Sequence, residues 1–441
     1  MSSQNKHAER AGELAELKPK ATAAAKRQSF PDQPLHPNGH VPTTLANFRH
    51  LLTEADISVR FNLIKKRAEV EYPGLVTKKQ NRDEVVLTYL QSLLIKNGLS
   101  TGQTSAYLLA VADSQPFDPF ADWVLSKPWD GTSRLAAIAG TIVPVDHYDL
   151  AFQQVLVTKW LLSIVAATFA GNGFRARGVL TLQGAQGLGK TSWIASLISP
   201  PKLRDDIVKL GHSWDGGRKD ARLTALRHRI VELGELEGSF RKDIASLKAF
   251  ITETTDKIRP PYGRVEAEYP RTTIFAASVN DEQFLLDSTG NSRFWTIPAA
   301  GIDYQHNIDM QQVFAELKVK LDSGAQWWLT SNEERQLEEV NRKHRVISAI
   351  EAKIEEALDL DRKDKPNLPR MTATEVLKAL GFSRPTNPQC KEANVALRGL
   401  LGKSKRSGGY NRWPIPWRDE FATTIREGGE TYATVDDDDL Y

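Results

Sequence analysis

The stretch Gly184-Ala185-Gln186-Gly187-Leu188-Gly189-Lys190-Thr191 decides the fold of the chain. It matches the phosphate-loop pattern G-x-x-x-x-G-K-[ST] at every fixed position. The apolar run 179–182 before it predicts a buried strand, and residues 192–198 after it predict the start of a helix. A strand, this loop and a helix in that order favour phosphate binding over the structural alternative, a Gly-rich turn without a ligand.

Each residue type in this loop has a physical task. Glycines allow the backbone to curl so that its N–H groups point at phosphate oxygens, and the helix N-terminus adds a partial positive charge. We expect Lys190 to reach the β- and γ-phosphates and the Thr191 hydroxyl to hold Mg²⁺. ATP and Mg²⁺ are therefore the expected cofactors. The expected nucleotide-binding residues are Gly184, Ala185, Gln186, Gly187, Leu188, Gly189, Lys190, Thr191 and Ser192.

A second predicted strand, residues 229–237, carries acidic side chains towards its C-terminal end. P-loop ATPases place a carboxylate on a strand beside the phosphate loop, where it binds Mg²⁺ and polarises the attacking water. We select Glu235 for this metal-binding and catalytic role. Glu232 and Glu237 stay open as alternatives, because one sequence cannot fix the register of a strand. Each of the three could instead be a solvated charge at a strand end.

Two further polar residues complete the predicted catalytic set. Asn280 follows the apolar strand 272–279, where a polar residue can contact the γ-phosphate and orient water. Arg293 lies in a Gly-Asn turn just before the apolar run 294–297. An arginine in such a turn can act as an arginine finger on the nucleotide of a neighbouring subunit. A structural salt bridge is the alternative for Arg293.

Two basic segments predict contact with nucleic acid. The turn Pro260-Pro261-Tyr262-Gly263 is flanked by cations and predicts a β-hairpin with a basic tip. Residues 370–418 predict two helices followed by a basic, Gly-tipped hairpin, which is the outline of a winged helix. A solvated hairpin and a protein-docking wing are the respective alternatives. The expected DNA-binding residues are Lys257, Arg259, Tyr262, Arg264, Lys403, Lys405, Arg406 and Arg412.

Composition is that of a soluble globular protein, with 40% hydrophobic and 26% charged residues among 441. The single cysteine, Cys390, excludes an internal disulfide framework and predicts a cytoplasmic location. The most apolar segment, 155–170, is shorter than the roughly 20 residues of a membrane span, so we expect a buried helix and no membrane partner. A net charge of +3 is too small to indicate nucleic-acid binding by itself.

The predicted fold class is α/β, with a P-loop AAA+-like core, a helical N-terminal domain and a small winged-helix-like C-terminal domain. The length of the chain predicts several domains. Their expected boundaries are a flexible leader at 1–45, the helical domain at 46–145, the ATPase core at 146–330, a charged helix and linker at 331–369, the winged-helix-like domain at 370–418 and an acidic tail at 419–441.

The core resembles the virulence-associated protein E (VapE) family of phages and mobile elements. The match covers about residues 85–300 well and the winged outline to 418 more weakly. The motifs that carry it are Trp129-Asp130-Gly131 with Arg134-Leu135, Gly184–Thr191, Val231–Leu236, Lys248-Ala249-Phe250, Arg259–Gly263, Asn280 and Gly290–Trp295.

The family is similar to superfamily 3 helicases and other AAA+-type replication ATPases. That resemblance implies a homo-oligomeric ring, usually a hexamer, with ATP between subunits and a hairpin lining the pore. It predicts a DNA-translocating ATPase and replicative helicase of phage or prophage type. Single-stranded DNA would be the partner, with duplex DNA at the winged domain, and priming would need a separate primase.

Three other functions compete with this prediction. A nucleotide-gated initiator would bind an origin without processive unwinding. A regulatory or defence ATPase would act on a protein and hydrolyse ATP independently of DNA. A small-molecule kinase would leave the basic segments without a task.

Overall fold

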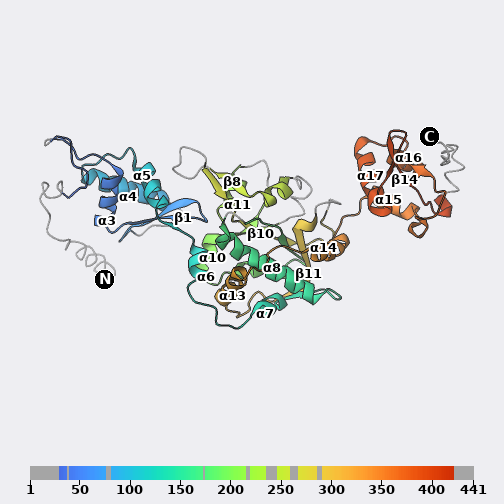
Figure 1. The fold of residues 1–441 in the computed structure, drawn as a ribbon, viewed down its shortest axis with the longest axis horizontal. Coiled ribbons are helices and arrows are strands. Elements are labelled where there is room, and N and C mark those ends of the chain that lie inside the picture. The colour runs from blue at the N-terminus through green and yellow to red at the C-terminus, as the bar shows by residue number, and fades with distance from the viewer. Residues whose placement is uncertain are drawn as a thin grey trace, which may run out of the picture.

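The structure is a computed structural model that describes residues 29–36, 39–75, 81–171, 174–214, 219–234, 246–258, 267–285 and 291–421. Its buried apolar side chains fall into separate clusters for an N-terminal module, a central α/β core and a C-terminal module. Figure 1 shows these parts following one another in blue, green to yellow, and orange to red.

The N-terminal module combines helices with a three-stranded sheet of order β2-β1-β3. We expected a mainly helical domain here, and the helices α3, α4 and α5 agree with that expectation, but the sheet was not predicted. Its strands are five residues or fewer, too short to give a clear alternating pattern. The elements are α3 (Leu45–Glu54), β1 (Ser58–Asn62), β2 (Arg67–Glu71), α4 (Arg82–Lys96), α5 (Thr104–Asp113) and β3 (Pro116–Phe117).

The central core is built on a six-stranded mixed sheet of order β4-β11-β5-β10-β7-β6. Strand β4 is antiparallel to β11, and the other neighbours are parallel. The C-terminal ends of these parallel strands therefore meet at one edge of the sheet. The strands are β4 (Ile142–Pro144), β5 (Val179–Gln183), β6 (Val208–His212), β7 (Ile230–Leu233), β10 (Ile274–Val279) and β11 (Phe294–Ile302).

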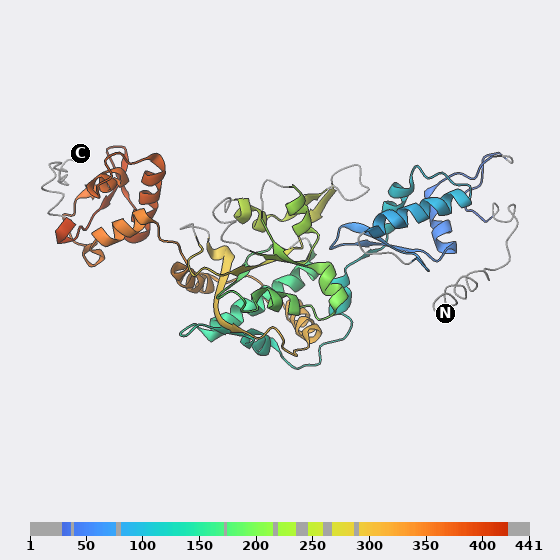
Figure 2. The same cartoon turned by 180° about the vertical axis from the view of Figure 1, so that it is seen from behind.

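Helices and one antiparallel pair surround this sheet (Figures 1 and 2). Residues 246–252 are also helical. Strands β8 (Thr255–Ile258) and β9 (Ala267–Pro270) form the arms of the predicted basic hairpin. The helices are α6 (Pro119–Val124), α7 (Leu135–Gly140), α8 (Leu150–Phe169), α9 (Lys190–Ser196), α10 (Pro201–Ile207), α11 (Lys219–Leu226), α13 (Met310–Asp322), α14 (Ser331–Lys343) and the 3₁₀ turn η4 (Asn291–Arg293).

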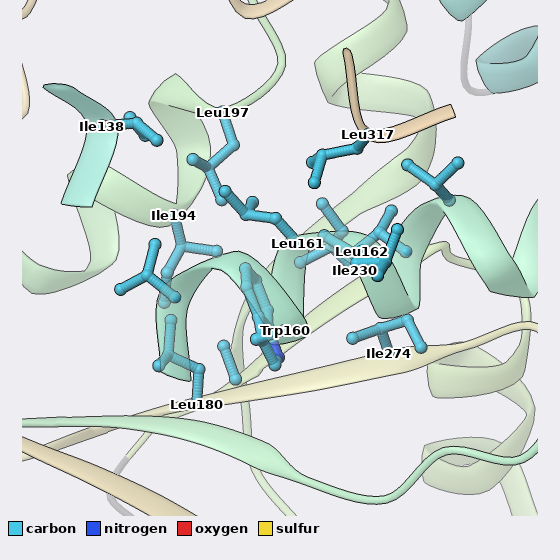
Figure 3. Close-up of a cluster of buried hydrophobic side chains, with 14 of the residues drawn as sticks. Ile138, Trp160, Leu161, Leu162, Leu180, Ile194, Leu197, Ile230, Ile274 and Leu317 are labelled. Atoms are coloured by element: carbon cyan, nitrogen blue, oxygen red, sulfur yellow. The ribbon is translucent and has the colours of Figure 1, made fainter. Parts of the chain in front are cut away.

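Helix α8 is the buried helix that the sequence predicts. It is long and apolar enough to cross a membrane, yet 67% of its most apolar window is buried within the protein. Figure 3 shows Trp160 and its neighbours on α8 packed among Leu180 and Ile274 of the sheet. The Trp160 Nε1–H also donates to the Phe275 carbonyl at 2.8 Å. These contacts identify α8 as a core helix.

The C-terminal module has the predicted order of two helices followed by a hairpin, on a sheet of order β12-β14-β13. We expected a charged helix and a linker over 331–369, but the structure has two helices there, α14 and α15, separated by residues 344–348. The Val346 N–H donates to the Leu285 carbonyl, and the Ser348 hydroxyl caps the second helix. The elements are α15 (Ala349–Ala357), η5 (Leu360–Arg362), β12 (Arg370–Met371), α16 (Ala373–Ala379), α17 (Asn387–Leu401), β13 (Lys405–Ser407) and β14 (Tyr410–Pro414).

Helix α15 shares its apolar core with this C-terminal module. Ile354 and Ala357 are fully buried in the same cluster as Leu397 of α17 and Trp413 of β14. The segment that we expected to be a charged helix and linker is therefore divided, with its second half packed into the C-terminal module.

Candidate nucleotide site

The phosphate loop lies at the C-terminal edge of the sheet, between β5 and α9, as the sequence predicts. The Gly184 N–H donates to the Val279 carbonyl of β10 at 3.1 Å, which ties the loop to the neighbouring strand. A Cβ atom at Gly184 would lie 2.5 Å from the Ala299 carbonyl oxygen, so a larger residue would displace the backbone. Gly189 has φ +93°, a conformation that glycine adopts at little cost.

Lys190 is the first residue of α9, and its side chain turns into the loop with only 6% of its surface exposed. The ammonium donates to the Gly184 carbonyl at 2.6 Å and to the Ala185 carbonyl at 2.8 Å. It also donates to Asn280 Oδ1 at 2.9 Å. The structure thus brings together two of the predicted catalytic residues, the lysine of the loop and the asparagine after β10.

A buried carboxylate, Glu232, lies at the centre of a second polar group. Its Oε1 accepts from the Ser278 hydroxyl at 2.6 Å and from the Thr191 hydroxyl at 3.2 Å. Its Oε2 accepts from the Gly211 N–H at 2.6 Å. Glu232 is only 1% exposed, which makes it unlike a solvated charge at a strand end. Of the three candidate acids, Glu232 is the one that the described residues connect to the phosphate loop.

The other two acids, Glu235 and Glu237, lie outside the described residues. Strand β7, which carries Glu232, is not the direct neighbour of β5 as we expected, because β10 lies between them. The Ser278 hydroxyl of β10 bridges this gap, since it lies 3.3 Å from the Thr191 hydroxyl and donates to Glu232.

Ser278 is a site residue that was not predicted, although the sequence contains a signal for it. Ser278 and Asn280 are two positions apart at the end of one strand, and such residues point to the same face. Likewise, Glu232 stands between apolar residues of a buried strand, where a charge requires partners.

The oxygen atoms of Thr191, Ser278 and Glu232 suit Mg²⁺, which prefers hard oxygen ligands and keeps several waters. Within the described ranges, no cluster of three or more His, Cys, Asp or Glu side chains could hold a metal ion. A site here would therefore be completed by phosphate oxygens and water, as is usual for Mg²⁺ with a nucleotide.

Arg293 lies at the other end of the sheet from the phosphate loop. Phe294, the next residue, pairs with Val179 at the start of β5, whereas Pro298 pairs with Gln183 just before the loop. Arg293 precedes Pro298 by five residues, which corresponds to about 16 Å along a strand. Arg293 is therefore remote from the loop of its own chain.

The basic hairpin is described only at its arms, because Arg259, Tyr262 and Arg264 lie outside the described residues. Lys257 forms an exposed ion pair with Glu268 across the two arms at 2.8 Å. Arg271 links the arms to the core, because its buried guanidinium donates to both oxygens of the buried Asp256 of β8 at 2.5–2.8 Å and to the carbonyl of Phe250 in the core at 2.8 Å.

The N-terminal module contacts the base of this hairpin. Phe61 of β1 stacks on Tyr269 of β9 with ring centroids 6.4 Å apart. The buried Lys66 donates to the Leu226 carbonyl at 2.5 Å. Burial lowers the pKa of Lys66 to about 8, with Arg229 among the cations that act in the same direction and Asp256 opposing them.

In the C-terminal module, Lys403, Lys405 and Arg406 are exposed on and before the hairpin. Arg412 instead forms an ion pair with Glu375 at 2.9 Å and donates to the Arg370 carbonyl at 3.0 Å. This gives Arg412 a structural task within the module. Sequence reasoning also missed two exposed cations on α17, Lys391 and Arg398.

A model of the virulence-associated protein E-like domain matches residues 124–346, just over half of the chain. The chain belongs to this family. The VapE-like region begins in α6 and ends after α14, so it contains the whole six-stranded sheet and the phosphate loop. It also contains the turn at Trp129, where Asp130 pairs with Arg134 at 2.7 Å.

Two solved structures of one protein are similar to this VapE-like chain. The A form apo structure of the NrS-1 C-terminal region has 15% sequence identity and a TM-score of 0.36, covering 84% of this chain and 98% of that one. A second apo structure of that region has 14% identity and a TM-score of 0.34, with the same coverage. No curated protein matches the chain.

Proposed function

We propose that this VapE-like protein is a Mg²⁺-dependent P-loop ATPase with an AAA+-like core that translocates DNA. We further propose that it acts as a ring-shaped replicative helicase of a phage or prophage. The first proposal rests on the residues at the edge of the sheet, and the second on the family and on the basic segments.

One observation carries the ATPase proposal. Polar groups from β7, from the end of β10 and from α9 converge at the C-terminal edge of the sheet, in the hydrogen-bonded sets Lys190–Asn280 and Thr191–Ser278–Glu232. Burial of a carboxylate close to an ammonium group costs free energy, and the packing of the fold does not by itself require this burial. The loop and these side chains together offer hydrogen-bond donors for a triphosphate and oxygen atoms for the cation that accompanies it.

In the proposed cycle the loop amides and the Lys190 ammonium bind the β- and γ-phosphates. Asn280, which already accepts from this ammonium, would contact the γ-phosphate and orient the attacking water. Glu232 would hold the water shell of the cation with Thr191 and accept a proton from the attacking water. Mg²⁺, when bound, would neutralise the charge that develops on the transferring phosphoryl group.

The position of Arg293 supports a site shared between subunits. With its backbone about 16 Å along the strand from its own loop, Arg293 is too far away to contact phosphates bound there. In a ring, the end of the sheet that carries Arg293 in one subunit can lie against the phosphate loop of the next subunit. Arg293 of one subunit would then complete the nucleotide site of its neighbour. A hexamer is the assembly that we propose from the family.

Loss of the γ-phosphate would remove its contacts to Asn280 and Arg293 and relax the subunit interface. The hairpin of β8 and β9 would move with that interface and carry single-stranded DNA by its phosphates. The exposed cations of the C-terminal module would bind duplex DNA, and a separate primase would supply primers.

The experiment that tests this proposal is an ATPase assay with and without single-stranded DNA, run beside a measurement of molecular mass in solution. We expect Mg²⁺-dependent hydrolysis, stimulation by single-stranded DNA and a mass that corresponds to a multimer. Hydrolysis that ignores DNA would favour a regulatory or defence ATPase. A monomer that neither binds nor hydrolyses ATP would contradict the proposal entirely.

A second candidate is a nucleotide-gated initiator that binds an origin without unwinding it. The exposed Lys391 and Arg398 on α17, in the same module as the basic hairpin at Lys405, favour it because a helix with such a face can enter a major groove. Site-specific duplex binding without strand separation would distinguish the initiator from the helicase.

A further inference from the structure

Tyr304 lies at the edge of the phosphate loop and takes no part in the function proposed above. It follows the C-terminal end of β11, which lies beside the phosphate loop. Its ring packs on Gly189, since a Cβ atom built there would lie 2.4 Å from Tyr304 Cδ1. Yet 40% of the Tyr304 surface is exposed. One part of the ring is therefore fixed on the loop while another part is open to a ligand.

Hydrogen bonds link the backbone on both sides of Tyr304 to α9, the helix that begins at the phosphate loop. The Trp193 Nε1–H donates to the Thr141 hydroxyl at 2.7 Å, and the Thr141 carbonyl accepts from the Asp303 N–H at 2.8 Å. On the other side, His306 Nε2 and the Ser196 hydroxyl are hydrogen-bonded at 3.1 Å. Trp193 and Ser196 both belong to α9. The ring position is thus set by the same helix that begins at the loop.

The two sides of the loop differ in chemistry. On the β10 side lie Asn280 and, beyond it, Glu232, the groups proposed for the γ-phosphate and its cation. The β11 side, which is opposite in the strand order, presents the exposed ring of Tyr304. A triphosphate whose terminal end faces Asn280 directs its nucleoside away from that side, towards the aromatic ring.

We propose that Tyr304 is the stacking surface for the base of a purine nucleoside triphosphate bound at the phosphate loop. This inference rests on the proposed function, because it requires a triphosphate in the loop. Stacking on an aromatic face tolerates different bases but is strongest for large ring systems. Tyr304 therefore sets the preference for purine over pyrimidine nucleotides, while the loop itself binds the phosphates.

The test measures equilibrium binding of ATP, CTP and inorganic tripolyphosphate to the full chain in the presence of Mg²⁺. We expect Tyr304→Ala to weaken ATP binding by about 5- to 150-fold, the range for loss of one base–aromatic stack. The preference for ATP over CTP should fall with it, and tripolyphosphate affinity should stay at the wild-type value. Tyr304→Phe should bind all three ligands like wild type. Tyr89→Ala, which removes another half-exposed tyrosine, is the matched control.

The outcomes separate this inference from the proposed function. If wild type binds ATP and tripolyphosphate but Tyr304→Ala binds ATP equally well, the stacking role is wrong and the ATPase proposal stands. An equal loss of ATP and tripolyphosphate binding in Tyr304→Ala means that the ring only shapes the loop, which also overturns the inference. If wild type binds neither ligand, both proposals fail together.

Discussion

The Thr191 hydroxyl donates a hydrogen bond to Glu232 Oε1 at 3.2 Å, and this contact joins the phosphate loop to a strand that is not its neighbour. Ser278, on the strand between them, donates to the same oxygen at 2.6 Å. The carboxylate is thereby held where a cation bound by Thr191 would meet it. Glu232 is the acid on which we base the mechanism.

Glu232→Gln should reduce ATP hydrolysis by about 10²- to 10⁴-fold, the usual range for loss of a general base. Nucleotide binding should remain, because the amide keeps the shape of the side chain. Matched variants are Glu235→Gln and Glu237→Gln, measured for turnover under saturating ATP. A large loss in either of these with normal turnover in Glu232→Gln would move the catalytic role to that residue.

Mixed subunits test whether Arg293 acts across an interface. Arg293→Ala and Lys190→Ala should each be inactive alone, whereas a mixture should regain part of the hydrolysis rate. Rescue is expected because some interfaces would then combine an intact loop with an intact arginine from the neighbour. Failure to regain activity at every mixing ratio would argue that Arg293 acts within one chain or only in folding.

The double substitution Arg259→Ala with Arg264→Ala tests the DNA-binding role of the hairpin. We expect weaker binding of single-stranded DNA, and a salt dependence whose slope falls by about 0.7 for each DNA phosphate that the variant no longer neutralises. The control is Lys202→Ala, since Lys202 is an exposed lysine of α10 outside the hairpin. Unchanged affinity and slope in the double variant would place the DNA site elsewhere.

His212 should make the stability of the core sensitive to acid. Burial lowers its pKa from 6.5 to about 4, and Lys209 and His228 act in the same direction. Between these values the unfolded chain binds a proton that the folded chain does not, so stability falls as the pH decreases from about 6.5 to about 4. The loss is on the order of 3 kcal/mol, at about 1.4 kcal/mol for each unit of pKa difference.

Urea unfolding of wild type and His212→Gln at several pH values measures this effect. The variant should lose less stability than wild type between neutral pH and pH 4, while His40→Gln, at an exposed position, should follow wild type. Parallel profiles for wild type and His212→Gln would show that His212 keeps an ordinary pKa in the folded protein.

The sequence predicts the local elements of the core better than their arrangement. The loop, β5, α8 and the hairpin arms follow from periodicity and turn residues, which act over short distances. The position of β10 between β5 and β7 depends on contacts between distant segments, which one sequence does not reveal. The contacts of Glu232 were not predictable for the same reason, since only the fold shows that Ser278 and Gly211 surround this carboxylate.

Module boundaries were also hard to predict. Strand β4 has three residues, yet it pairs with β11 and so belongs to the central sheet rather than to the N-terminal domain. Helix α15 is charged on its exposed side, but Ile354 joins the core of the C-terminal module. In both cases tertiary packing determines to which module the element belongs. The composition of the chain around β4 and α15 gives little indication of these contacts.

The most direct measurement of the central claim is the binding of ATP with Mg²⁺ to wild type and to Lys190→Ala by titration calorimetry, together with their hydrolysis rates. Lys202→Ala, at an exposed lysine of α10, is the control, and thermal unfolding checks that all three proteins fold. We predict that wild type and Lys202→Ala bind and hydrolyse ATP and that folded Lys190→Ala does neither. Unchanged binding and turnover in Lys190→Ala would contradict the assignment of the phosphate loop as the ATP site.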